Sequence, residues 1–408
     1  MLCQFTIKNY KSIRDEITFD MQAAAISEHT DRIIKDADDQ LFLPVSSIYG
    51  PNGGGKSNVL EALQTLCTMV LKPVYATKQN GTADYKFNKY PVKPFMFSEE
   101  SRNNATRFEV FFRTKLAEYK YALSVHNGVV VNESLDRVKL ETGRKSALFL
   151  RKGDAVNLKG VFARLKISEG LSKNLPLLSY LGITYMDNDV VTDAMNWFEN
   201  GIDFLNYGNP FEELRTAIAS SEEIKHLVLD MIREMDLDIE DFRVEERKND
   251  RIEVFTQHIV DGSKTELALS EESSGTKKLF GLLPFIAKSL VFGTTLLIDE
   301  LDAKIHPVLL KYVIMLYNNM EINKHGAQLI FTSHDLSTMN NEVFRRDEIW
   351  FVAKGNRQNS KLYSLVEFKT GNGEVVRKDA KYDKQYLEGK YGADPYLRRI
   401  IDWSTLNA

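Results

Sequence analysis

Gly50-Pro51-Asn52-Gly53-Gly54-Gly55-Lys56-Ser57 is the stretch that decides the fold of this 408-residue chain. Its spacing fits GxxxxGK[ST], in which glycines let backbone N–H groups turn inward and form a concave anion site. Apolar residues within 45–49 predict a buried strand before the loop, and the helical spacing of apolar residues in 57–70 predicts a helix after it. The positive N-terminal end of that helix favours phosphate. The stretch therefore predicts a site for a nucleoside triphosphate.

The loop also predicts which residues bind the nucleotide and its metal. Lys56 is expected to reach the β- and γ-phosphates, and Ser57 is expected to ligate Mg²⁺. ATP and Mg²⁺ are therefore the expected cofactors. The other residues of this segment that are expected to contact the nucleotide are Asn52, Gly53, Gly54, Gly55 and Asn58.

Residues 294–298 read as a continuous apolar strand that ends in Asp299 and Glu300. This is the form expected of a fully buried parallel strand beside the phosphate loop. Asp299 is expected to hold the metal, directly or through water, and Glu300 is expected to polarise the attacking water. Two carboxylates also occur at ordinary strand ends, so the catalytic interpretation depends on the phosphate loop.

A second candidate phosphate-binding end precedes the apolar helix predicted over 279–291. Residues 272–278 read Glu-Ser-Ser-Gly-Thr-Lys-Lys, which places hydroxyls, a glycine and free backbone N–H groups at a helix N-terminus. Within one chain this end would be remote from the loop, so Ser273, Ser274 and Gly275 are expected to close on a nucleotide held by another copy. An ordinary helix cap is the alternative.

A strand predicted over 328–332 ends in Ser333-His334-Asp335. At a strand terminus beside the presumed catalytic strand, His334 is placed to hydrogen-bond the γ-phosphate and report its presence. The alternative is a histidine with an ordinary structural role in the core or at the surface. The order of the motifs favours the functional interpretation.

These motifs, in this order, resemble the ATP-binding-cassette ATPase head shared by SMC and RecF proteins. Residues 5–13 resemble the first strand of such heads, which packs against the nucleotide site. More narrowly, residues 299–307 and 391–395 are similar to the OLD-like ATPases of bacterial abortive-infection and phage-defence systems, the RloA and AbiL type. The resemblance covers both ends of the chain and hardly the middle. The resemblance implies that Glu300 serves ATP hydrolysis and that His334 senses the γ-phosphate. It also implies that residues 273–275 contact ATP that is bound to another copy of the chain.

The glutamine that usually touches Mg²⁺ in cassette ATPases has no clear counterpart. Gln64 lies inside the helix predicted after the phosphate loop, and Gln79 lies in a polar stretch. Neither follows a convincing strand. Metal coordination by a glutamine is therefore unassigned.

The predicted fold class is α/β: a P-loop NTPase with an ABC-ATPase-like head, an antiparallel β arm and a helical insertion. Alternating apolar residues around 105–140, with a turn at residues 126–128, indicate the arm. From about residue 145 to 236 the pattern becomes helical. The expected divisions are 1–140 for the N-terminal half of the head with its loop and arm, 141–236 for the insertion, and 237–408 for the C-terminal half. No heptad run is long enough for the rod of an SMC protein.

Composition indicates an intracellular globular protein. A chain with 43% hydrophobic residues can bury one large core with an inserted subdomain, or two modest ones. Cys3 and Cys67 each lie in a predicted apolar element, which excludes a disulfide framework and a cysteine metal site. The start of the chain carries no signal sequence, and residues 282–292 contain Lys288 and are too short to span a bilayer. A cytoplasmic protein that does not enter membranes is expected.

Charge is uneven along the chain. The net charge of −4 argues against a protein that coats DNA along its whole surface. From Arg137 to Lys173, however, basic residues clearly outnumber acidic ones. A solvated face is one interpretation of this basic stretch, and a contact with nucleic acid or an acidic protein is the other.

Three classes of function remain open. The favoured one is an ATPase that forms a homodimer or higher homo-oligomer head to tail around ATP and controls a separately encoded effector, a toxin or a nuclease, in anti-phage defence. Too few residues follow His334 for the C-terminal nuclease domain of many OLD-like relatives, and Asp187-Asn188-Asp189 fits a helix start better than a metal site. A RecF-like DNA-repair ATPase is second. A transporter ATPase subunit is third, because the opening strand and inserted helices fit it less well.

Overall fold

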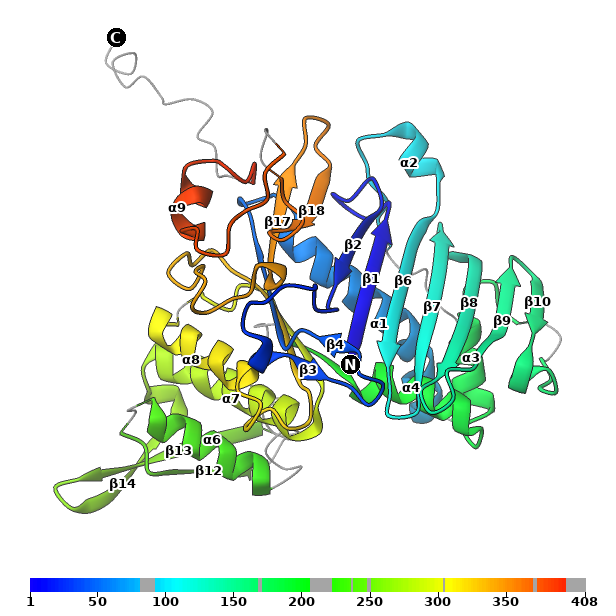
Figure 1. The fold of residues 1–408 in the computed structure, drawn as a ribbon. Coiled ribbons are helices and arrows are strands. Elements are labelled where there is room, and N and C mark those ends of the chain that lie inside the picture. The colour runs from blue at the N-terminus through cyan, green and yellow to red at the C-terminus, as the bar shows by residue number, and fades with distance from the viewer. Residues whose placement is uncertain are drawn as a thin grey trace, which may run out of the picture.

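The computed structural model describes residues 1–80, 92–167, 171–205, 222–235, 238–247, 251–303, 305–369 and 373–393. Two large β-sheets form its body, with helices packed against both (Figure 1). One sheet is mainly parallel and carries the phosphate loop. The other is antiparallel and forms the arm.

The parallel sheet brings the predicted motif strands together. Its order is β11 (Ile202–Leu205), β15 (Thr295–Ile298), β16 (Gln328–Thr332), β5 (Val45–Tyr49), β17 (Ile349–Lys354) and β18 (Ser360–Ser364). The first five strands are parallel, and β18 runs antiparallel to β17. Because β15, β16 and β5 are neighbours, the segments after all three lie at one edge of the sheet, which is where ligands bind in such folds.

The antiparallel sheet confirms the predicted arm. Its order is β10 (Ala155–Leu158), β9 (Lys145–Lys152), β8 (Val129–Lys139), β7 (Ala117–His126), β6 (Thr106–Arg113), β1 (Leu2–Lys8) and β2 (Ile17–Asp20) (Figure 1). Asn127 and Gly128 join β7 to β8 with φ values of 51° and 78°. Two positive φ angles are what a two-residue hairpin turn requires.

The prediction of a helical pattern from about residue 145 is wrong for 145–158, which form β9 and β10. The pairing of β8 with β9 shifts register between Leu135 and Asp136. Adjacent Leu148 and Phe149 are both buried as a result, which breaks the alternation that would reveal a strand. Among the residues of this stretch that the structure describes, the α-helices are α3 (Leu177–Thr184), α4 (Asp189–Asn200) and α6 (Glu222–Glu234). The three expected domain boundaries themselves stay predictions.

Two hydrophobic cores lie on opposite faces of the parallel sheet. Leu297 and Ile330 face a core shared with α1 (Lys56–Asn80), α3, α4 and the antiparallel sheet. Leu296 and Ile298 face the opposite core, which is formed with α6 (Glu222–Glu234), α7 (Ser274–Phe292) and α8 (Pro307–Asn318). A strand buried on both faces explains the continuous apolar run before Asp299.

A third sheet was not predicted. It has the order β12 (Asp241–Arg247), β13 (Arg251–Val260) and β14 (Ser263–Ala268), and its β13–β14 hairpin projects from the body near α6 (Figure 1). Residues 263–266 of β14 are all exposed, so this strand lacks the apolar alternation of a half-buried sheet. The remaining short elements are β3 (Ile34–Lys35), β4 (Leu41–Phe42), α2 (Glu99–Asn103) and α9 (Tyr382–Leu387).

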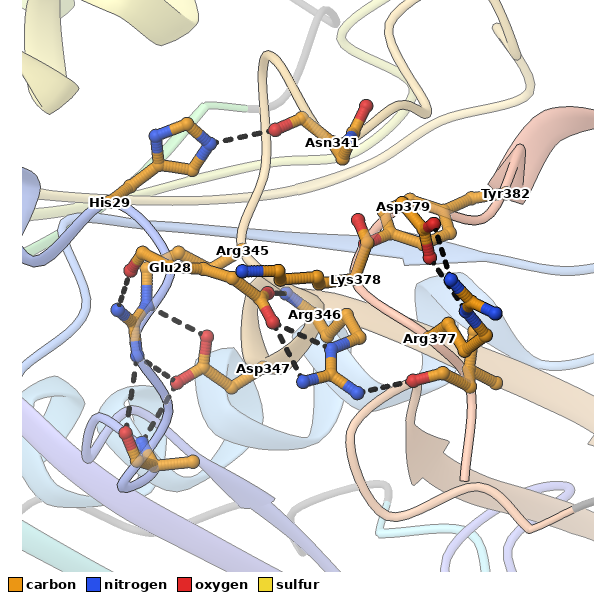
Figure 2. Close-up of polar contacts among 12 residues, drawn as sticks. Glu28, His29, Asn341, Arg345, Arg346, Asp347, Arg377, Lys378, Asp379 and Tyr382 are labelled. Carbon is orange, nitrogen blue, oxygen red and sulfur yellow. Dashed lines mark hydrogen bonds and ion pairs between the residues drawn. The ribbon is translucent and has the colours of Figure 1, made fainter. Parts of the chain in front are cut away.

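A polar cluster joins three segments that are distant in sequence (Figure 2). Arg345 is fully buried, and its guanidinium donates to Asp347 at 2.9 and 2.7 Å and to the Ala24 carbonyl at 3.2 Å. Arg346 donates to Glu28 at 2.8 Å and also to the carbonyl of Val376. The loop around residues 24–28 and the tail near residue 376 are thereby held against the turn that leads into β17.

The fold also bears on the interpretation of residues 187–189. Asn188 caps α4, because its Oδ1 accepts from the backbone N–H groups of Val190 and Val191 at 3.1 and 3.2 Å. This favours the helix-start interpretation of residues 187–189 over a metal site. In the part of the chain that the structure describes, no helix is both long and apolar enough to cross a bilayer.

Candidate nucleotide-binding site

The phosphate loop connects β5 to α1, as its sequence predicts. Gly55 has φ of 108°, and a Cβ there would lie 2.3 Å from Ser360 Oγ and 2.5 Å from Ser12 Oγ. Only glycine fits this close approach. Ser12 also accepts from Asn58 Nδ2 at 2.6 Å, so the opening segment of the chain packs against the loop as expected. Asn52, in the same loop, is exposed to solvent.

Lys56 is the first residue of α1 and is only 6% exposed. Its Nζ donates to the Gly50 carbonyl at 2.9 Å and lies 3.0 Å from His334 Nε2. Burial lowers the pKa of Lys56, and the carboxylates of Asp299 and Glu300 oppose that shift. A buried ammonium favours an anionic partner. The lysine is therefore held over the loop in a position suited to a phosphate group.

The carboxyl end of β15 is fixed by the last residue of β16. Thr332 Oγ1 donates to Asp299 Oδ1 at 2.5 Å and accepts from the backbone N–H of Glu300 at 2.7 Å. Glu300 has φ of 50° and an exposed side chain. A left-handed conformation costs a non-glycine residue about 1–2 kcal/mol and is concentrated at functional sites. Thr332 was missed from the sequence because a threonine at a strand end gives no distinctive signal.

The two expected metal residues face one space. Ser57 and Asp299 both line a cavity of about 210 Å³ beside the phosphate loop. A hydroxyl and a carboxylate oxygen are the donors that Mg²⁺ prefers, so the residues present fit the expected metal. Gln64 lines the same cavity and is thus the better placed of the two glutamines considered, since the side chain of Gln79 lies outside the described residues.

His334 links the lysine to the segment after β15. Its ring contacts Lys56 as given above, and its backbone N–H donates to Asp302 Oδ2 at 3.1 Å. Burial and the neighbouring Lys56 ammonium lower the pKa of His334. The imidazole is therefore neutral at pH 7, and its Nε2 accepts from the lysine. Asp302 Oδ1 is buried and has no hydrogen-bond partner in the described part of the chain.

Residues 273–275 form the exposed N-terminal corner of α7. Ser273 caps the helix, with its Oγ accepting from the Thr276 N–H at 3.0 Å. Ser273 and Ser274 are exposed, and neither they nor Gly275 line the described cavity beside the phosphate loop. A Cβ on Gly275 would meet only Ser273 Oγ, at 3.7 Å. No neighbour within the described chain therefore requires glycine at this position.

Comparison with known families supplies the identity of the domain. A family model described as "AAA domain, putative AbiEii toxin, Type IV TA system" matches residues 45–340. The match begins at β5 and includes the phosphate loop, residues 273–275, Asp299 and His334. The chain belongs to this family. It is a P-loop ATPase of the AAA type, with the ABC-like α/β fold class predicted from its motifs.

Solved structures of SMC heads are also similar to this AAA-family chain. The SMC head domain from Thermotoga maritima is 14% identical with a TM-score of 0.40, covering 89% of this chain and 98% of that chain. An SMC head bound to the C-winged helix domain of ScpA is 14% identical with a TM-score of 0.45, and the match covers 89% of this chain and 97% of that chain. A third structure is an SMC head with an extended coiled coil, bound to the C-terminal domain of ScpA derived from Pyrococcus furiosus. It is 12% identical with a TM-score of 0.39, and the match covers 89% of this chain and 96% of that chain. No curated protein matches the sequence.

The narrower resemblance to OLD-like ATPases stays a prediction. The AAA-family match ends at residue 340, before the similar tail at 391–395. Within that tail, Tyr391 and Ala393 are buried, whereas residues 394 and 395 lie outside the described part of the chain.

The basic stretch between Arg137 and Lys173 is not one solvated face. Arg151 is 1% exposed and donates to the carbonyls of Gly153 at 3.0 Å and Leu175 at 2.6 Å. Arg137 is 8% exposed and lies over the ring of Tyr119. These two arginines serve the fold and do not belong to an interaction surface. The exposed basic residues of the stretch include Lys139, Arg144, Lys145, Lys152 and Lys159.

Proposed function

We propose that this AAA-family chain is an ATP-driven switch that pairs head to tail with a second copy around ATP and controls a separately encoded effector, a toxin or a nuclease, in bacterial anti-phage defence. The pairing and hydrolysis rest on the geometry of the site. The effector and the defence role rest on the resemblance to OLD-like ATPases and on the family description, which refers to a toxin of a type IV toxin–antitoxin system.

One observation carries the proposal: the chain presents two separate half-sites. One half gathers Lys56, Ser57 and Asp299 at the edge of the parallel sheet. The other half is the exposed corner 273–275. Gly275 lies in the first turn of α7, and a Cβ there would meet no close neighbour in the described chain, so packing within one copy does not require glycine. Close approach by a second molecule gives this glycine a purpose.

Each residue then has a defined task. Backbone N–H groups of residues 53–57 and the Lys56 ammonium bind the phosphates. Ser57 and Asp299 would hold Mg²⁺, which would supply positive charge next to the phosphates. Glu300 accepts a proton from the attacking water, and His334 donates a hydrogen bond to a γ-phosphate oxygen as its reporter. Ser274 and Gly275 of the second copy complete the pocket. Hydrolysis removes the γ-phosphate that both copies bind, so the pair loosens.

The direct test of this switch is the oligomeric state of Glu300→Gln. This variant keeps the shape of the side chain but cannot accept the proton, so ATP should persist and the mass of the particle in solution should double with saturating ATP and Mg²⁺. The double variant Lys56→Ala/Glu300→Gln should remain a monomer under the same conditions. A Glu300→Gln protein whose mass is the same with and without ATP, while ATP binding is intact, would contradict the proposal. Effector control is tested by what co-purifies with the trapped pair.

DNA binding of the RecF kind is the second candidate, and the exposed basic residues favour it. Arg144, Lys145 and Lys152 are exposed on the arm sheet or its hairpin turn. Reversing these three charges should abolish ATP-dependent duplex binding and its salt dependence if the arm contacts phosphates. Arg151 is left unchanged because it is buried. Duplex binding that is absent at low salt would eliminate this candidate.

A further inference from the structure

The exposed corner at residues 273–275 is tethered to the third sheet by three side chains. Glu272 immediately precedes the corner, and its Oε1 lies 2.8 Å from Nε2 of His258 on β13. Thr256, two residues earlier on the same strand, donates its hydroxyl to the same Oε1 at 2.6 Å. Thr256 is fully buried, and the side chains of His258 and Glu272 are 21% and 11% exposed. None of these residues belongs to the phosphate-loop half-site.

Both ring nitrogens of His258 have partners. Nδ1 lies 2.5 Å from the backbone carbonyl of Asp238, which can only accept a hydrogen bond, so Nδ1 carries a proton. Nε2 faces the Glu272 carboxyl group, and this contact needs a proton between the two atoms. The imidazole and the carboxyl group therefore share a hydrogen bond through that proton.

The tether controls a short and otherwise exposed segment. Apart from this carboxyl group, Glu272 is held by its backbone N–H, which donates to the Leu269 carbonyl at 3.2 Å. Ser273 follows directly as the cap of α7, and the backbone N–H groups of the first turn point out of the helix. The direction of Glu272 therefore sets where the corner and its free N–H groups lie.

We propose that His258 is a positioning residue: together with Thr256 it holds Glu272, and it thereby fixes the Ser273–Gly275 corner in the geometry needed for the nucleotide of the second copy. This assignment rests on the proposed head-to-tail function. It also gives the third sheet a role, because β13 connects the nucleotide-contacting corner to the projecting β13–β14 hairpin.

The tether is tested first without nucleotide, by hydrogen–deuterium exchange of the full chain. His258→Ala should make the hydrogen-bonded amides of Thr276 and Lys277 exchange up to roughly tenfold faster, the effect of losing one hydrogen bond. His226→Ala, which removes an exposed histidine on α6, is the matched control. Glu272→Gln keeps the shape and one acceptor oxygen, and should give a smaller increase. Unchanged exchange in both His258→Ala and Glu272→Gln would overturn the tether.

The second measurement separates the tether from the switch itself. In the Glu300→Gln background, His258→Ala should raise the dissociation constant of the ATP-bound pair about tenfold while ATP affinity of the single head stays the same. Adding Glu272→Ala should cause little further loss, because the two residues act through one contact. If Glu300→Gln alone does not pair, the proposed function fails and the exchange result still decides the tether. If it pairs and His258→Ala pairs equally well, only the positioning role is wrong.

Discussion

Lys56 Nζ and His334 Nε2 lie 3.0 Å apart, although 278 residues separate them in the sequence. The pairing of β5 with β16 brings them together, since both follow the carboxyl ends of neighbouring parallel strands. The lysine that is expected to bind phosphate thus already touches the histidine that is expected to report it. A change at the phosphate would be transmitted to His334 in a single contact.

His334→Ala should lower kcat by about ten- to a hundredfold, the effect of losing one hydrogen bond to the charged phosphate. ATP affinity should change little, because Lys56 and the loop backbone remain. Steady-state hydrolysis combined with equilibrium binding separates the two effects. His334→Gln, which keeps a polar group near the same position, should recover part of the rate. A loss of ATP binding equal to the loss of rate would contradict the sensor role.

Thr332→Val should slow hydrolysis by about tenfold, since it removes both hydrogen bonds that fix Asp299 and the Glu300 backbone. Valine has nearly the same shape, so packing in the buried strand is preserved. Thr332→Ser restores the hydroxyl and should restore the rate. Hydrolysis rates are compared at saturating and at limiting Mg²⁺. The valine variant should also need a higher Mg²⁺ concentration to reach half of its maximal rate. Equal rates for all three proteins would show that the hydroxyl has no part in the site.

Arg345→Met should destabilise the protein by about 3–5 kcal/mol, because it leaves the Asp347 carboxylate buried without its partner. Arg377→Met is the matched control, because the side chains of Arg377 and its partner Asp379 are 80% and 60% exposed (Figure 2). Loss of this exposed ion pair should not change the free energy of unfolding measurably. Denaturant unfolding of both variants gives the comparison. If Arg345→Met and wild type unfold at a similar denaturant concentration, the contacts of Arg345 do not hold the loop around residues 24–28 in place.

Glu348 should make stability fall as pH rises. Burial is the main cause that raises its pKa to about 8, from an ordinary value of 4.5. Between these values the folded state keeps a proton that the unfolded state has lost, so each pH unit in that window costs at most about 1.4 kcal/mol. Glu348→Gln cannot titrate, yet it can still accept from the Arg345 N–H. Its melting temperature should match wild type near pH 4.5 and exceed it at pH 8. A constant difference across the range would refute the shift.

Local patterns predicted the strands and the helix that surround the candidate half-site. The strands before Asp299 and His334 each carry an apolar run, the phosphate loop carries its glycine-rich spacing, and parallel pairing then places the three segments together. The role of Thr332 depends on a contact between two strands, which no local pattern contains. Likewise, the sequence shows Arg151 as one charge among many, and only the fold reveals that it is buried against backbone carbonyls.

The missed strands have equally specific causes. In β9 the shifted register buries adjacent Leu148 and Phe149, so the period of two is lost. In β14 the first four residues are all exposed, so no alternation arises. The tether between His258 and Glu272 could not be predicted either, because it requires the register that places β13 beside the start of α7.

The central claim is that each pocket combines the loop of one copy with the corner of another, and complementation tests it most directly. Lys56→Ala and Ser274→Arg should each abolish ATP hydrolysis when assayed alone. Mixed in equal amounts, they should recover up to about half of wild-type activity, since only the mixed pair contains an intact pocket, one out of its two. Recovery at that level would support the shared pocket. No recovery from two folded variants would contradict it.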